Sequence, residues 1–533
     1  MTAYDVVVVG SGINSLVCAA RLARAGRRVA VLERNDRLGG CIRTEELFPG
    51  YRHELMAGWY PLFVGSPAYA ELGADLEARG LELLNTSMPT GVLTSDGRSL
   101  VLTTDRDENR RRFDEAQAGD GERFAREMEA FLASDSELTF GLLGSEPKSM
   151  GATRLVLRSG RKRGVGDTTA FFGRSLETCR TWLERCFESD LVRGLIAPWV
   201  LHAGLGPDDA YSGLMGRVII ASVEMGGMPV VRGGGENLVQ AFEKLIGDNG
   251  GELRVGTEVA RIVVAEGAAR GVETSDGERL DAGSVVCNVT PTQLYGRLLP
   301  SEHVPEAVRR DAADYRYGRA DMQVHFALSG PPRWPSPELA QVAMVHVTDG
   351  LDAVSQAVNE AERGLLPAQG TIVVGQPTAV DPSRAPEGGG ILWLQLQELP
   401  RVVRGDAAGE IATPDDGRWT PELGEAYADR IQARLAELLP DLGDQIVGRR
   451  VLTPADLEAL NPNLVGGDPY SGACTLDQFF LWRPLPSTKN HTTPVKGLYH
   501  IGASTHPGPG LGGVSGYLAA DRLLHRRLPR RPR

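Results

Sequence analysis

The sequence contains no apolar run long enough to cross a membrane. A spanning helix needs about 18 or more consecutive apolar residues, and the nearest candidate, Leu214–Val231, is interrupted by Arg217, Glu224 and several glycines. The apolar run Val6–Val9 is short and has no basic flank, so it is not typical of a secretory signal. We therefore expect no membrane span, and only a peripheral membrane contact stays open.

Metal-site spacing of cysteine and histidine is also missing. None of the nine histidines falls in an H-x3-H or H-E-x-x-H pattern, and no C-x-x-C pair occurs among the six cysteines: Cys18, Cys41, Cys179, Cys186, Cys287 and Cys474. Structural and catalytic zinc sites usually show such spacing. The sequence thus predicts no metal site, and scattered cysteines are typical of the reducing cytoplasm.

Positive charge is scarce. The 57 Lys and Arg residues face 69 Asp and Glu residues, which gives a formal net charge of −12. A nucleic-acid-binding protein needs a basic face, so this class is excluded. The basic runs Arg110–Arg112 and Arg161–Arg163 and the basic tail 526–533 are expected to be solvated, with weak attraction to an anionic membrane as the alternative.

The composition is that of a folded protein of several units. Hydrophobic residues make up 42% and charged residues 24% of the chain, which excludes a largely disordered protein. A chain of 533 residues suggests roughly three units of ordinary size.

The amino terminus carries a dinucleotide-binding pattern. The β-branched run Tyr4–Val9 predicts a buried strand, and the following GSGINS places Gly10, Gly12 and Ser15 in a G-x-G-x-x-G/A frame. A helical pattern and a second strand at 28–32 follow, ending in Glu33. This order of strand, glycine turn, helix, strand and acid is that of a Rossmann unit.

Each position of this pattern has a physical role. Gly10 permits the tight turn, Gly12 lets a pyrophosphate approach the backbone, and a small residue such as Ser15 lets helix and strand pack closely. The helix N-terminus offers free N–H groups to the phosphate. Glu33 is placed to accept hydrogen bonds from ribose hydroxyls and disfavours a 2′-phosphate, so FAD or NAD fits better than NADP.

The segment after Glu33 favours FAD. It begins RNDRLGGCIRTEELFPGY and resembles the FAD-binding fingerprint of the flavin amine oxidase and phytoene desaturase superfamily, E-R-x-x-x-x-G-G followed by Arg or Thr. The resemblance implies cofactor contacts on the ribityl–pyrophosphate side from Arg34, Gly39, Gly40, Arg43 and Thr44. Near the isoalloxazine it implies contacts from Ala57, Gly58 and Trp59.

Two later blocks resemble the same superfamily. In block 232–288, the resemblance implies that the backbone of Val259 holds the adenine, with a plain strand residue as the alternative, and Asn288 follows the last strand as a further predicted contact. In block 453–524, a strand at 498–501 precedes a glycine-rich turn and a helix whose first amides can stabilise negative charge at the flavin edge. The predicted contacts there are Gly502, Gly513 and Val514.

The third block resembles one subgroup of this superfamily and differs from it at one turn. Its pattern LDQ…RP…TP…GLYHIGAST-HPG is similar to that of carotenoid desaturases, desaturase-like ketolases and pyridine-nucleotide-disulphide-domain flavoproteins. The usual H-P-G-G-G-V turn is here extended by Leu511 and an extra glycine, which is expected to reshape the loop beside the flavin. The sequence identifies no catalytic residue. His506, in this turn, is the best candidate near the ring, and the alternative is that it only holds the turn.

The predicted fold class is α/β. We expect a Rossmann-type FAD-binding domain assembled from three segments (1–74, 226–299 and 446–533) and a second, mixed α+β substrate domain (75–225 and 300–445). In the second domain we expect helices at 113–134, 175–196 and 422–439, strands at 323–328, 342–347 and 391–398, and an exposed loop at 381–390. Its aromatic residues either fill the core or line an apolar channel: Phe171, Phe172, Trp182, Phe187 and Trp199.

The resemblance implies an FAD-dependent oxidoreductase. It would dehydrogenate or oxidise a largely apolar organic substrate by hydride transfer to flavin N5, with oxygen or a quinone as external electron acceptor. A flavin amine oxidase is the alternative enzyme, and a non-catalytic, flavin-stabilised interaction protein is the alternative class. The single nucleotide fingerprint argues against a simple NAD-dependent dehydrogenase, and the oligomeric state stays open.

Overall fold

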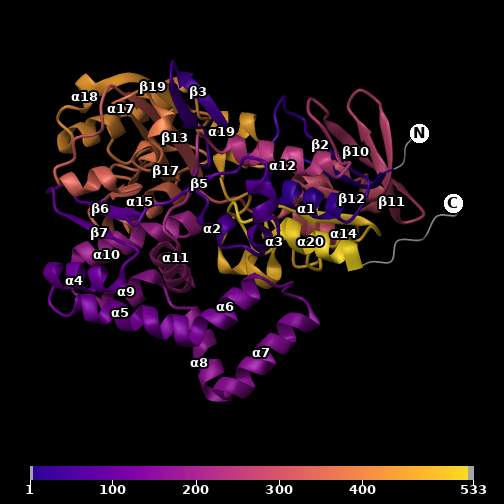
Figure 1. The fold of residues 1–533 in the computed structure, drawn as a ribbon, viewed down its shortest axis with the longest axis horizontal. Coiled ribbons are helices and arrows are strands. Elements are labelled where there is room, and N and C mark those ends of the chain that lie inside the picture. Colours follow the sequence, from indigo (N-terminus) through magenta and orange to yellow (C-terminus); the bar gives the residue numbers. More distant parts are fainter. Residues whose placement is uncertain (1–3, 526–533) are drawn as a thin grey trace.

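The chain folds around two seven-stranded sheets that lie side by side (Figure 1). The computed structural model describes residues 4–525, and the basic tail predicted at 526–533 lies outside this range. The sheet built around the amino terminus lies on the right of Figure 1, and the other sheet lies on the left.

The first sheet is the predicted Rossmann unit. Strand β1 (Tyr4–Val9) lies parallel between β2 (Val29–Leu32) and β12 (Arg279–Asn288). Val6 and Val8 belong to a core shared with α1 (Ile13–Arg24), whereas Val7 and Val9 belong to the core on the opposite face. Because both faces are covered, the strand is apolar throughout, as is typical of a buried parallel sheet.

Three distant parts of the chain build this sheet. Its order is β10–β11–β12–β1–β2–β9, and β20 pairs with β12. The remaining strands are β9 (Glu252–Arg254), β10 (Val259–Ala265), β11 (Ala268–Thr274) and β20 (Leu498–Ile501). Two further helices, α12 (Glu236–Asp248) and α20 (Val514–His525), cover the same face as α1. The predicted assembly of a Rossmann-type sheet from three segments is confirmed.

The second sheet has the order β19–β13–β17–β16–β14–β6–β7. Its strands are β6 (Thr90–Leu93), β7 (Ser99–Leu102), β13 (Ala320–Leu328), β14 (Met344–Val347), β16 (Ile372–Gly375), β17 (Gly390–Leu399) and β19 (Ile446–Leu452). The three predicted strands of this region and the helix α17 (Pro421–Leu438) are confirmed. Strand β19 was predicted to belong to the FAD-binding segment 446–533, but it is part of the second sheet. Its backbone pairs there with β13.

The helical layer between residues 106 and 226 differs from its prediction. The helix expected at 113–134 is present but divided, because Gly119, with φ of 91°, separates α4 (Arg106–Ala116) from α5 (Asp120–Ala130). The helix expected at 175–196 ends at Ile196 as predicted but is also divided, since α9 (Cys179–Cys186) ends before Ser189, whose side chain caps α10 (Asp190–Ile196). Helices α7 (Met150–Arg163) and α8 (Val165–Ser175) project from the body of the molecule (Figure 1).

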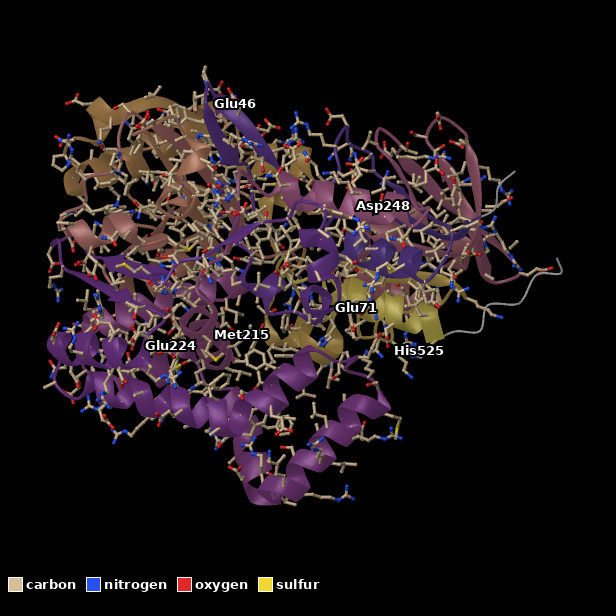
Figure 2. All side chains as sticks on the ribbon, in the orientation of Figure 1. Glu46, Glu71, Met215, Glu224, Asp248 and His525 are labelled. Carbon is tan, nitrogen blue, oxygen red and sulfur yellow. The ribbon has the colours of Figure 1, made fainter. Side chains whose placement is uncertain are left out.

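The charged residues that interrupt the apolar run at 214–231 are buried on α11 (Ser212–Gly226), and each is paired. Glu224, labelled in Figure 2, accepts from Arg106 Nη2 at 2.6 Å, and Arg217 Nη2 lies 2.8 Å from Glu177 Oε2. These ion pairs connect α11 to Arg106 on α4 and to Glu177. Because each buried charge has a partner of opposite sign, a largely buried helix can contain charged residues. Within residues 4–525, no helix combines the length and apolar character that a bilayer crossing requires.

Candidate functional site

A cavity of about 400 Å³ runs from the carboxyl end of β1 to the face of the second sheet. Most of the predicted cofactor contacts line it. On the nucleotide side these are Gly10, Gly12, Glu33, Arg34, Gly39, Gly40, Val259 and Asn288. On the side of the second sheet they are Ala57, Gly58 and Trp59.

The glycines form a cradle that has no room for side chains. Gly10 has φ of 84°, and Gly12 stands at the N-cap of α1. A Cβ atom on Gly12 would lie 3.2 Å from Asn288 Nδ2, and one on Gly40 would lie 3.0 Å from Gly12 Cα. The bare backbone at a helix N-terminus is the surface that binds a pyrophosphate, so these residues fit the nucleotide half of FAD.

Glu33 is oriented for a ribose. Its Oε2 accepts from Ser11 N at 2.9 Å and from Ser11 Oγ at 2.7 Å, and its Oε1 accepts from Asn35 N at 3.0 Å. A carboxylate has about four acceptor positions, so one remains for a ribose hydroxyl. The side chain is 6% exposed and borders the cavity.

Seven predicted residues are not among the described residues that line the cavity: Ser15, Arg43, Thr44, Gly502, His506, Gly513 and Val514. Several of them hold the lining elements instead. Ser15 Oγ accepts from Asn288 Nδ2 at 3.0 Å, and Thr44 Oγ1 donates to Glu54 Oε2 at 3.1 Å. A Cβ atom on Gly513 would lie 2.7 Å from Val17 Cγ2, so this glycine lets α20 approach α1 closely.

His506 is buried away from the cavity lining. Its Nε2 lies 3.1 Å from the carbonyl oxygens of both Leu142 and Leu143, at the end of α6 (Ser136–Leu143). Burial lowers the pKa of His506 to about 4, so the ring is neutral at pH 7 and donates from Nε2 to a carbonyl. This geometry fits the alternative role of His506, in which the side chain only holds the turn.

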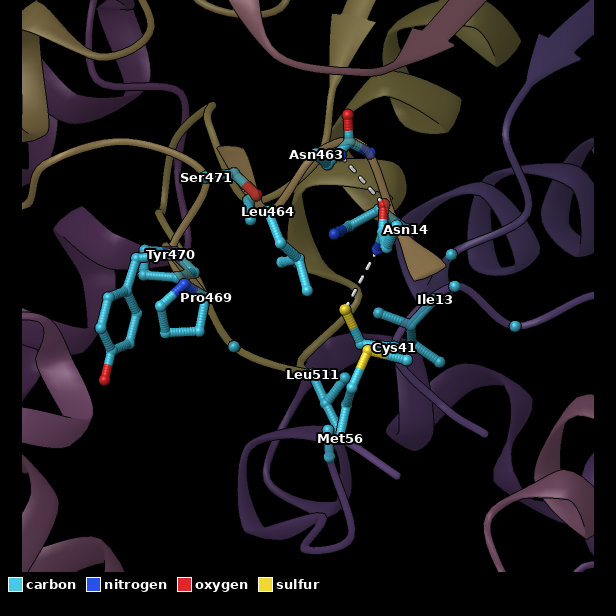
Figure 3. Close-up of a pocket in the computed structure, with 18 of the residues that line it drawn as sticks. Ile13, Asn14, Cys41, Met56, Asn463, Leu464, Pro469, Tyr470, Ser471 and Leu511 are labelled. Atoms are coloured by element: carbon cyan, nitrogen blue, oxygen red, sulfur yellow. Dashed lines mark hydrogen bonds between the residues drawn. The ribbon is translucent and has the colours of Figure 1, made fainter. Parts of the chain in front are cut away.

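The second wall of the cavity contains Trp199, which was considered as a channel residue, whereas the polar part of this wall was not predicted. Its apolar part comes from α11, the second sheet and the short 3-10 helix Ala197–Ala203: Val218, Ile219, Val223, Met344, Trp393 and Trp199. Its polar part comes from β13, β17 and a later loop: Asp321, Gln323, Gln395, Gln397 and Tyr470. Figure 3 shows Tyr470 and Pro469 on one side of the open space, and Ile13 and Cys41 on the other.

A sequence signal for the polar part exists. Polar residues occupy alternate positions in two otherwise apolar strands, ADMQVHFAL and ILWLQLQEL. Such alternation marks one polar face, and the unusual feature is that the polar side chains Asp321, Gln323 and Gln397 of this face are buried. Of the aromatic residues considered for a channel, Trp199 lines the cavity, Trp182 and Phe187 fill the core, and Phe172 is exposed.

Comparison with known proteins agrees with this site. The family described as flavin containing amine oxidoreductase matches residues 16–524. One of the subunits of a limonene dehydrogenase from Castellaniella defragrans is 30% identical and covers 97% of this chain and 94% of its own. A pyridine nucleotide-disulfide oxidoreductase domain-containing protein 2 of Rattus norvegicus is 27% identical and covers 97% of this chain and 92% of its own.

Solved structures share the fold. Cyclohexylamine oxidase from Brevibacterium oxydans superimposes with a TM-score of 0.58 at 17% identity, over 98% of this chain and 99% of that chain. Putrescine oxidase bound to putrescine gives a TM-score of 0.58 at 16% identity, over 98% and 100% of the two chains. The relatives, the glycine cradle and the oriented Glu33 together make FAD the cofactor of this oxidoreductase. The chain belongs to the flavin-containing amine oxidoreductase family.

Proposed function

We propose that this FAD-dependent oxidoreductase dehydrogenates a largely apolar organic substrate held between α11 and the second sheet. The proposal rests on the contacts between the flavin side of the cavity and the second sheet. Trp393 Nε1 donates to Met56 O at 3.1 Å, and a Cβ atom on Gly375 would touch both Trp393 and Trp59. An aromatic, water-excluding surface therefore begins directly beside the segment 57–59 that is predicted to contact the flavin.

The protein's part in this reaction is to bind and orient. The apolar side chains of α11 and the tryptophans exclude water from the substrate and hold it against the flavin side of the cavity. FAD, when bound, supplies the acceptor for the hydride that dehydrogenation removes, while a proton leaves in the same overall reaction. The cofactor contacts proposed are the predicted residues that line the cavity.

The relatives favour this substrate class over an amine. The 30% identical relative is named a dehydrogenase of limonene, a hydrocarbon, whereas the amine oxidases share only 16–17% identity. We propose oxygen or a quinone as the external electron acceptor. The division into an FAD-binding part and a substrate-binding part follows the two sheets, with β19 assigned to the second.

The projecting helices support a peripheral membrane contact. Met150, Leu157 and Val165 are exposed on α7 and α8, beside the basic residues Arg154 and Arg158. Apolar side chains next to cations are the composition of a surface that meets an anionic bilayer. A cytoplasmic location is proposed as well, because all six cysteines are free thiols.

The test of the activity is spectroscopic. The purified protein should show the two visible bands of oxidised flavin, and anaerobic mixing with limonene or a related hydrocarbon should bleach them. Bleaching with cyclohexylamine instead, followed by peroxide release in air, would assign an amine oxidase. Bands that no donor bleaches would overturn dehydrogenation of an apolar substrate.

A further inference from the structure

The second sheet presents a row of polar side chains to the cavity. β13 and β17 are antiparallel, and Gln323 pairs directly with Gln395. Side chains two residues apart on a strand share a face, so Asp321 lies beside Gln323, and Gln397 lies beside Gln395. Met322, Leu394 and Leu396 point to the opposite face, where they belong to the core beneath the sheet.

Hydrogen bonds within this row of side chains fix the orientation of the glutamine amide groups. Asp321 Oδ2 accepts from Gln323 Nε2 and from Gln395 Nε2, both at 2.9 Å. Gln397 Nε2 donates to the Tyr470 hydroxyl at 2.8 Å, because that hydroxyl donates to the carbonyl oxygen of Leu201. The amide nitrogens are thus engaged within the row, and the amide oxygens face elsewhere.

Three acceptor oxygens are left over. Asp321 Oδ1, Gln323 Oε1 and Gln397 Oε1 are buried and have no hydrogen-bond partner among residues 4–525. The three side chains are only 1–4% exposed. Buried acceptors are nearly always satisfied in native proteins, because an unpaired one has lost its hydrogen bonds to water without replacement.

All three oxygens belong to residues that line the cavity, opposite the apolar wall of α11. A donor that satisfies them must therefore come from what occupies the cavity. We propose that the substrate carries, on its apolar body, one hydrogen-bond-donating head group, a hydroxyl or an amine, which Asp321, Gln323 and Gln397 bind. This rests on the proposed function and narrows its substrate class.

The chemistry of the carboxyl suits such a head group. Burial raises the pKa of Asp321 to about 7, and the hydrogen bonds from Gln395 and Gln323 oppose this rise. A bound ammonium group would favour the ionised carboxylate, whereas a hydroxyl can donate to either form. A pure hydrocarbon would leave all three acceptors unpaired.

Three probes with one apolar body separate these cases: butylbenzene, 4-phenylbutan-1-ol and 4-phenylbutan-1-amine. Their dissociation constants for the FAD-loaded enzyme can be measured by calorimetry, without turnover. The alcohol or the amine should bind at least about tenfold more tightly than butylbenzene, the difference that one satisfied buried acceptor makes. Preference for the amine identifies a cationic head group, and preference for the alcohol identifies a neutral one.

Matched variants assign the preference to the row. Asp321→Asn and Gln323→Met should each reduce it about tenfold while changing the affinity for butylbenzene less than twofold. Glu398→Gln is the control, because Glu398 is a buried carboxylate of the same strand as Gln395 and Gln397 that accepts from Thr371 and does not line the cavity. It should leave the preference unchanged.

Equal affinity for the three probes, binding of none of them, or a preference that survives in Asp321→Asn would overturn the proposal. In those cases ordered water or the bound FAD, and not a substrate head group, satisfies the three acceptors. The binding measurement tests the head-group site, and the bleaching of the flavin tests the dehydrogenation, so the two proposals can fail independently. An enzyme that prefers the alcohol but whose flavin no donor bleaches would keep the head-group site and refute the dehydrogenation.

Discussion

Arg384 and Glu54 form a buried ion pair that joins the loop 381–390 to a segment 330 positions away in the chain. Arg384 Nη1 lies 2.7 Å from Glu54 Oε1, and the two side chains are 0% and 3% exposed. Arg384 also binds Asp381 and the carbonyl oxygen of Val231, and Glu54 accepts from the amide of Gly235. The loop 381–390 is exposed at 382–383 and 386–388, as predicted, and it is anchored by the buried side chains of Asp381 and Arg384.

Breaking this pair should destabilise the protein strongly. Arg384→Met leaves Glu54 as a buried carboxylate that has lost its cation, which costs about 3–5 kcal/mol. The expected result is a large decrease in the Tm of the FAD-loaded protein. Arg98→Met removes a cation from an exposed pair with Asp96 and should leave Tm unchanged. An equal effect of the two variants would show that the buried pair contributes nothing special.

A side chain at Gly12 should weaken FAD binding. The residue has φ of −61°, so alanine fits the backbone, but its Cβ would approach Asn288 and occupy the cradle. We expect Gly12→Ala to lower FAD retention after dialysis at least about tenfold, read from the ratio of absorbance at the flavin band to that of protein. Gly247→Ala, on α12 with open space around it, is the control. Full retention by Gly12→Ala would contradict the cradle.

The pH dependence of stability should carry the signature of Asp321. Its folded pKa of about 7 lies above its ordinary value of 3.8, so its protonated form contributes stability that is fully present below about pH 4 and is lost as pH rises through 7. Asn cannot ionise. The Tm of Asp321→Asn relative to the parent should therefore increase between pH 4.5 and 7.5, as scanning fluorimetry would show. A difference that is constant with pH would mean that Asp321 ionises normally.

His506 should matter for stability and not for chemistry. His506→Phe removes the donor to the carbonyl groups of Leu142 and Leu143, so Tm should decrease while kcat of the remaining folded enzyme stays within twofold. His506→Gln keeps a donor and should restore part of the Tm. A large loss of kcat in both variants, with Tm unchanged, would instead place His506 in catalysis.

Membrane contact should depend on the projecting helices. Leu157→Ser and Val165→Ser, combined, should reduce co-flotation with vesicles that contain phosphatidylglycerol, and phosphatidylcholine vesicles should bind weakly from the start. The matched control is Val447→Ser, which changes an exposed apolar residue on β19. Figure 1 shows β19 at the opposite end of the view from α7 and α8. Flotation that none of these changes affects would locate the contact elsewhere or exclude it.

The sequence by itself determined the Rossmann unit, and the resemblance of the segment after Glu33 to a known superfamily indicated FAD as its cofactor. The residues from Tyr4 to Glu33 are neighbours along the chain, and the strand, turn, helix and acid follow from local spacing alone. The predicted strands of the second sheet held for the same reason, because β-branched and apolar alternation is local. The helices predicted at 113–134 and 175–196 are each divided, because Gly119 and Ser189 begin a new helix at a place that hydrophobic spacing does not indicate.

Only the tertiary structure decided what the cavity presents to a substrate. Gln397 meets Tyr470 across 73 positions, Arg384 meets Glu54 across 330, and β19 leaves its predicted segment to pair with β13. Such contacts depend on which strands become neighbours and on which face each side chain points, and no local pattern encodes either. The cofactor is therefore readable from consecutive residues, whereas the chemistry that selects the substrate arises where distant segments meet.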